Sequence, residues 1–98
     1  MDRQSIIDVL RQREAELHAL GVRRLGLFGS YARGDADEHS DIDLLSALDE
    51  TKELSLLDLV HIENLLADAL GRAVDLVDAK SLDPRVRDEV HDTVIYAF

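Results

Sequence analysis

Apolar residues recur along the chain with two periods, one typical of helices and the other typical of strands. Segments in which they fall three or four positions apart predict helices over residues 3–20 and 54–70. Runs of branched and apolar residues bounded by glycine or polar turns predict strands over 22–28, 41–48 and 73–77, and a strand-like tail over 93–98. Short helices are expected over 31–33 and 85–91. The alternation predicts an α/β (α+β) fold in which helices flank a mixed β-sheet.

The two long helices carry residues that a simple apolar stripe does not explain. Arg13 falls inside the stripe of the first helix, so its guanidinium must extend outward, pair with an acid or serve something bound nearby. In the second helix, 100° per residue predicts a core-facing stripe of Leu56, Leu59, Val60, Ile62, Leu66 and Leu70. Leu54, Leu57 and Leu65 gather with His61 on the opposite side, where another part of the chain or a partner must cover them.

Composition limits the classes of protein to consider. Ninety-eight residues predict one domain over 1–98, and 46% apolar against 33% charged residues is typical of a globular chain. The absence of cysteine excludes disulfides and thiolate zinc sites and favours a cytoplasmic location. No apolar run approaches the ~20 residues of a membrane span, so no membrane association is expected. The net charge of −10 argues against stable nucleic-acid binding by this chain alone and suits divalent cations or a basic protein partner.

The candidate chemistry lies where the first strand ends and the second begins. Gly29-Ser30 is followed, after ten residues, by Asp41-Ile42-Asp43. Side chains alternate along a strand, so Asp41 and Asp43 point the same way, roughly 7 Å apart, and both can coordinate a hard cation. Glycine permits close backbone approach, and the Ser30 hydroxyl with N–H groups at a helix start can hold an anion. Asp75, an acid inside an apolar strand, is the expected third carboxylate.

The residues around this motif leave alternatives open. Arg33 could neutralise triphosphate charge or face solvent, and we include it with Gly29 and Ser30 as a candidate nucleotide-binding residue. Tyr31 could stack on a base or pack beneath the loop. His39 is expected to be a solvated loop residue, because Mg²⁺ prefers oxygen ligands.

These motifs resemble those of the nucleotidyltransferase superfamily that includes DNA polymerase beta, and the whole layout is similar to its smallest branch, the minimal nucleotidyltransferase (MNT) domain proteins. The resemblance rests on Gly29-Ser30, Asp41-x-Asp43 and Asp75, and covers nearly all of the chain. It implies that Gly29 and Ser30 hold the triphosphate of ATP and that Asp41 and Asp43 bind a pair of Mg²⁺ ions. It makes Asp75 the third acid of the metal and catalytic set, helping an acceptor hydroxyl to attack the α-phosphorus.

The resemblance also implies a partner. MNT proteins are typically encoded beside a HEPN-domain ribonuclease toxin and act as its antitoxin, and characterised members transfer AMP from ATP to a tyrosine of the toxin. We therefore expect an adenylyltransferase antitoxin that forms a hetero-oligomer with its toxin. The size of the chain agrees, because it has room for one nucleotide site but little for an acceptor domain. The alternative is a binding module that neutralises the toxin by occlusion with little turnover, whereas transfer to a small molecule fits poorly.

Overall fold

The computed structural model describes residues 1–98, and its elements follow the predicted order closely. They are α1 (Arg3–Gln12), α2 (Glu14–Ala19), β1 (Val22–Phe28), α3 (Gly29–Arg33), β2 (Ile42–Leu48), α4 (Leu56–Leu70), β3 (Val74–Asp78), the 3₁₀ turn η1 (Ala79–Ser81), α5 (Pro84–Thr93) and β4 (Ile95–Tyr96). None of the helices combines the length and the apolar character that crossing a membrane requires.

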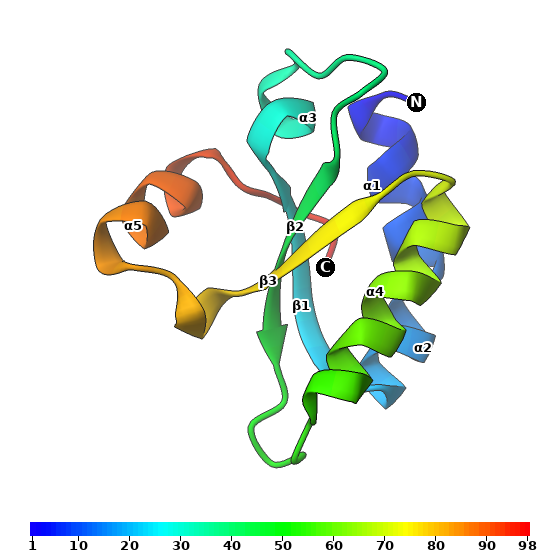
Figure 1. Cartoon of the computed structure of the whole chain (residues 1–98), viewed down its shortest axis with the longest axis vertical. Coiled ribbons are helices and arrows are strands. Elements are labelled where there is room, and N and C mark those ends of the chain that lie inside the picture. Colours follow the sequence, from blue (N-terminus) through cyan, green and yellow to red (C-terminus); the bar gives the residue numbers. More distant parts are fainter.

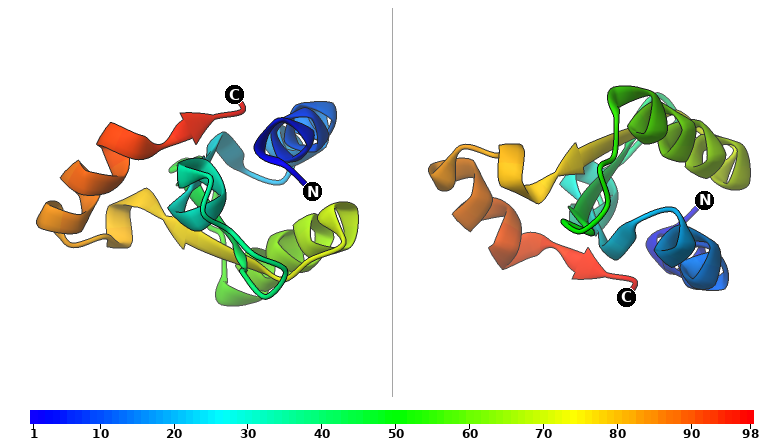
Figure 2. Two further views of the ribbon diagram at one scale, coloured as in Figure 1. Left: turned by 90° about the horizontal axis from the view of Figure 1, so that it is seen from above. Right: turned by 90° about the horizontal axis from the view of Figure 1, so that it is seen from below.

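Four strands form one mixed sheet in the order β3-β2-β1-β4, which confirms the predicted fold class. β1 pairs antiparallel with both β2 and β4, whereas β2 pairs parallel with β3 across the α4 crossover. Figure 1 shows α1, α2 and α4 on one side of the sheet and α5 on the other. The views along the sheet show that α5 connects β3 at one edge to β4 at the opposite edge (Figure 2).

The core lies between the sheet and the helices α1, α2 and α4. Alternate positions of β1 and β2 point into it, and the fully buried set includes Leu25, Leu27, Ile42 and Leu44. Because strand side chains alternate, the positions between them, including Phe28 and Asp43, project from the opposite face toward α5. One face of the sheet is therefore apolar and packs in the core, and the other face directs side chains such as Asp43 toward α5.

The first predicted helix is in fact two helices, and the break falls at Arg13. Its backbone leaves the helical region, and its N–H donates to the carbonyl of Leu10, three residues back, at 3.1 Å. The Arg13 side chain pairs with Glu16 at 3.4 Å on the surface, so one of the structural roles considered for it is confirmed. The bend lets α1 pack on α4 while α2, through the buried Leu17, packs beside β1. No glycine or proline marks this break in the sequence.

The predicted apolar stripe of α4 is correct in its second half and wrong in its first. Ile62, Leu66 and Leu70 are buried, but Leu56 and Val60 are 76% and 45% exposed. The physical reason is that the first turns of α4 do not pack closely on the sheet, since a groove lined by Leu56, Leu59, Val60 and Leu76 lies between them.

On the opposite face of α4, the chain itself covers two of the three leucines for which this alternative was left open. Leu65 packs against the core cluster, and the Leu54 side chain lies over Gly21, so the chain itself covers both. Leu57 is 80% exposed. The uncovered apolar residues of α4 are therefore Leu56, Leu57 and Val60.

Candidate functional site

The turn from β1 into α3 places Gly29 directly against Asp43. Gly29 has φ +73°, a conformation that side-chain-bearing residues rarely adopt. A Cβ at this position would meet the Asp43 carboxylate, with its Cγ 3.0 Å and its Cβ 3.2 Å away. Glycine is thus required twice, by the backbone angle and by the close approach of the acid. The sequence reasoning on this glycine is consistent with the geometry.

Sheet register brings Asp43 and Asp75 side by side. Asp43 of β2 pairs with Phe28 of β1 on one side and with Asp75 of β3 on the other. In a parallel pair, residues in register project from the same face, so both carboxylates lie on the face toward α5. Asp41 precedes β2 by one residue and is exposed.

The charges of the other two acids act on Asp43. The pKa of Asp43 is raised, first because the half-buried carboxyl loses hydration, then because of the negative charges of Asp75 and Asp41. Arg33 acts in the opposite direction and lowers the pKa of Asp43. The predicted carboxylates and the predicted arginine therefore share one electrostatic environment.

A cleft of about 580 Å³ opens beside Asp43. Its sheet-side wall consists of Phe28, Gly29, Ser30, Arg33 and Asp43, and its other wall consists of Glu89, Val90 and Thr93 of α5. The volume falls within the range of small-molecule sites in proteins. Gly29, Ser30, Arg33 and Asp43 were predicted from the sequence, whereas Asp41 and Asp75 lie outside the lining.

Sequence reasoning missed the α5 wall of the cleft. It predicted a helix over 85–91 but gave its residues no role in the site, because nothing in the motif reaches that far along the chain. The order of the strands was the signal that could have indicated this wall of the cleft. A helix between the edge strand β3 and a terminal strand at the other edge must cross the uncovered face of the sheet.

The open questions about neighbouring residues are partly answered by burial and pairing. Tyr31 is buried in the core cluster, so it packs beneath the loop. Arg33 lines the cleft and also pairs with Asp35 at 3.2 Å on the surface. His39 is exposed and has Glu38 at 3.5 Å, in agreement with a solvated loop position.

The donor set suits a hard cation, although the side chains form no group of three or more acidic or histidine residues spaced as ligands of one metal ion. Carboxylate oxygens are the ligands that Mg²⁺ prefers. The mutual repulsion at Asp43 is of the kind that a bound cation relieves. The residues thus fit Mg²⁺ by their chemistry and by their charge.

The loop before Asp41 is held by a contact that the sequence did not indicate. The guanidinium of Arg72, in the turn between α4 and β3, donates to the carbonyl of Glu38 at 3.1 Å. The backbone N–H of Ile42 donates to the carbonyl of Ala73 at 2.9 Å. Both bonds attach the segment that carries Asp41 to the start of the strand that carries Asp75.

Comparison with known proteins identifies this arrangement. A family model described as "Nucleotidyltransferase domain" matches residues 4–97. The chain is 39% identical over 94 residues to the protein adenylyltransferase MntA of Thermococcus cleftensis, and the match covers 95% of this chain and 93% of that protein. The chain belongs to the nucleotidyltransferase domain family. Within it, the protein is an enzyme of the protein adenylyltransferase type, built on the minimal nucleotidyltransferase fold.

Solved structures agree with the family assignment. A structure provisionally assigned as a minimal nucleotidyltransferase has 40% sequence identity and a TM-score of 0.75, covering 97% of this chain and 95% of that one. The crystal structure of a toxin–antitoxin with AMP-PNP has 25% identity and a TM-score of 0.70, covering 90% of this chain and 72% of that one.

Proposed function

We propose that this chain is an antitoxin that transfers AMP from ATP, with Mg²⁺, to a hydroxyl group of a HEPN ribonuclease toxin, expected to be that of a tyrosine, and thereby neutralises the toxin. The observation that carries the proposal is the contact of Gly29 with Asp43 at the mouth of a cleft, with Asp75 in register beside it. The MntA relative supports the type of reaction, and the toxin–antitoxin relative with AMP-PNP supports the nucleotide and the kind of partner.

In the proposed function, different residues of the site bind the phosphates and the metal ions. The Ser30 hydroxyl and the Arg33 guanidinium are the polar groups beside Gly29 that can donate to phosphate oxygens. The Arg33–Asp35 pair is solvent-exposed and therefore weak, so the guanidinium can turn to a phosphate at little cost. Asp41, Asp43 and Asp75 would hold the Mg²⁺ ions. When bound, Mg²⁺ supplies positive charge that offsets the charge of the phosphates and of the leaving pyrophosphate.

The position of Asp75 suits an acceptor that belongs to another macromolecule. Asp75 is exposed on the edge strand β3, where a hydroxyl of a docked protein can approach it from outside the sheet. In the proposed step, Asp75 accepts the proton of that hydroxyl as the hydroxyl oxygen bonds to the α-phosphorus. The bond from the α-phosphorus to its bridging oxygen breaks, and pyrophosphate leaves.

The test uses the toxin, ATP, Mg²⁺ and a catalytic amount of this protein. We expect ~329 Da of added mass on the toxin for each AMP, the increment of α-phosphoryl transfer with loss of pyrophosphate. The modified toxin should remain inactive after the antitoxin is removed. Asp43→Asn should abolish transfer, whereas Asp88→Asn, an exposed acid of α5 outside the cleft lining, should leave it unchanged.

The occlusion alternative gives the opposite pattern. Under occlusion, rescue needs stoichiometric protein, survives Asp43→Asn and leaves the mass of the toxin unchanged. Nucleotide binding is tested separately by thermal unfolding, because a ligand at 100 times its dissociation constant stabilises the native state by about 2.7 kcal/mol. An unchanged melting temperature at millimolar Mg²⁺-ATP would contradict the assignment of the cleft.

A further inference from the structure

The first half of α4 exposes apolar side chains that the rest of the chain leaves uncovered. Leu57 and Leu56 are 80% and 76% exposed, and Val60, one turn after Leu56, is 45% exposed. In contrast, the second half of the same helix buries its apolar residues in the core. Isolated exposed apolar residues are common, but these three lie within five consecutive residues of one helix.

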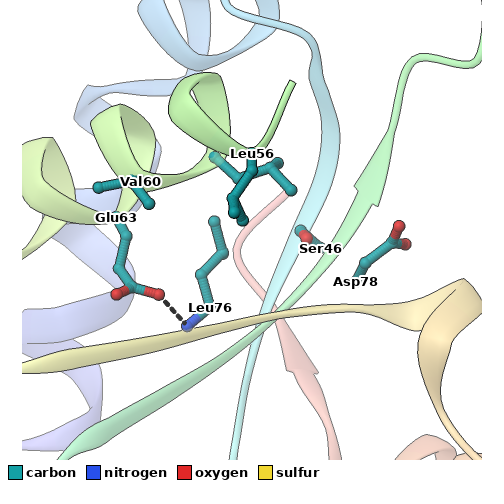
Figure 3. Close-up of a pocket in the computed structure, with 7 residues that line it drawn as sticks. Ser46, Leu56, Val60, Glu63, Leu76 and Asp78 are labelled. Carbon is teal, nitrogen blue, oxygen red and sulfur yellow. Dashed lines mark hydrogen bonds between the residues drawn. The ribbon is translucent and has the colours of Figure 1, made fainter. Parts of the chain in front are cut away.

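Beside these residues, α4 and the sheet enclose a small groove of about 150 Å³. Its apolar lining is Leu56, Leu59 and Val60 from α4 and Leu76 from β3. Figure 3 shows Leu56 and Val60 on the helix, with Leu76 facing them from β3. A groove of this size can receive part of an apolar side chain. We call this site the α4 groove.

Two acids line the α4 groove, Glu63 and Asp78, and Asp78 also lies in a neighbouring hollow lined by Arg23, Arg24 and Lys80. Glu63 accepts the N–H of Leu76 at 3.1 Å through one carboxylate oxygen, and its other oxygen makes no hydrogen bond (Figure 3). Asp78 likewise accepts the N–H of Lys80 at 3.1 Å through one oxygen. Neither acid takes part in an ion pair, since Lys80 pairs with Glu50. No basic residue lines the groove.

The apolar lining, the Glu63 carboxylate, which forms no ion pair, and the net charge of −10 together select the occupant. A second copy of this chain would bring another net charge of −10 against the acids, and an anionic membrane or a nucleic acid would be repelled in the same way. A protein segment that presents apolar side chains flanked by lysine or arginine meets both requirements. We propose that the α4 groove is a docking surface for such a segment, and that the segment belongs to the acceptor protein.

The second part of this inference rests on the proposed function, and the fold gives it a geometric reason. Leu76 of the groove directly follows Asp75 on β3, and adjacent strand residues project from opposite faces of the sheet. The groove and the proposed catalytic acid therefore lie on the two sides of one exposed edge strand. A protein anchored in the groove lies beside β3, from where another part of it can extend around the edge toward Asp75.

The first test uses two synthetic helical peptides with the same leucine face, one with lysine and the other with glutamate on the polar face. Fluorescence anisotropy should show binding of the lysine peptide that weakens with salt and no binding of the glutamate peptide. Leu56→Gln and Val60→Gln should each weaken binding about tenfold or more, because each removes an apolar contact of the groove. Val86→Gln is the matched control, since Val86 is 43% exposed on α5 and should have no effect.

Three results would overturn the docking surface: equal binding of both peptides, equal losses for Val86→Gln and the α4 variants, or a dimer of the chain in sedimentation that Leu56→Gln dissociates.

The second test measures transfer to the toxin. Leu56→Gln should raise the KM for the toxin about tenfold and leave the Mg²⁺-ATP melting shift unchanged. An unchanged KM would refute the assignment to the acceptor. A missing Mg²⁺-ATP shift in the unmodified protein would instead refute the proposed function.

Discussion

Replacement of Gly29 by alanine tests the central contact of the site, and the chain supplies its own control. Gly29 and Gly71 have nearly equal φ angles, +73° and +69°, so alanine is strained at both by about 1–2 kcal/mol. A Cβ at Gly71 would meet nothing within 4 Å, whereas at Gly29 it would meet the Asp43 side chain as far back as its Cβ. Relieving such overpacking costs about 1–3 kcal/mol more. Gly29→Ala should therefore destabilise the fold by that additional amount.

Thermal unfolding followed by circular dichroism measures this difference. In a domain of this size, 1 kcal/mol shifts the melting temperature by about 4–8 °C. Gly71→Ala should lower it by the strain alone, and Gly29→Ala by clearly more. Asp43→Ala removes the carboxylate but keeps the Cβ at 3.2 Å, so in this background the excess cost of Gly29→Ala should become clearly smaller, which a double-mutant cycle detects. Equal losses for the two glycines, or an excess that is undiminished without the Asp43 carboxylate, would refute the contact.

Three further substitutions test the electrostatics, a helix cap and the strand packing. The raised pKa of Asp43 means that the native state binds its proton more tightly than the unfolded state, so this contribution to stability is present below pH 3.8 and lost as the pH rises through the native pKa. Asp43→Asn should therefore raise the free energy of unfolding at pH 7 and not at pH 3, as urea denaturation at both pH values would show. Ser55→Ala removes the capping box of α4 and should cost about 1 kcal/mol, seen as a lower melting temperature. Gly26→Ala would place a Cβ 2.6 Å from Val94 and push β4 away, so hydrogen exchange should show lost protection of the Ala97 amide.

The sequence predicted the order of the elements well because their signals are local. The β1 strand was predicted with its observed bounds, since Val22 follows a glycine and Gly29 ends the run. The break at Arg13 could not be predicted, because it depends on α1 and α2 packing against different elements. The exposure of Leu56 and Val60 likewise depends on packing between elements that are distant in the sequence. Helical periodicity defines a stripe, but only the packing of α4 on the sheet decides how much of that stripe is covered.

The candidate site could be predicted where one motif contains its residues. Gly29 and Asp43 belong to that motif, and their contact follows from antiparallel pairing of β1 with β2. Asp75 could be placed on a neighbouring strand, because an acid within an apolar strand requires an explanation. Glu89 and Thr93 could not be placed, since their contribution depends on the path of α5 across the sheet. Local spacing therefore predicts one wall of the cleft, and topology supplies the other.

The charges around the cleft explain why nucleotide and acceptor are expected to meet at Asp43. Arg33 is the one basic residue that lines the cleft, together with the acids Asp43 and Glu89, so the cleft by itself does not favour a polyanion. Under the proposed function, a triphosphate would enter this site together with cations, which the acids at Asp41, Asp43 and Asp75 would attract. Asp43 belongs to the cleft, whereas Asp75 belongs to the open edge. Cations held between these two acids would join the nucleotide on one side to the acceptor on the other.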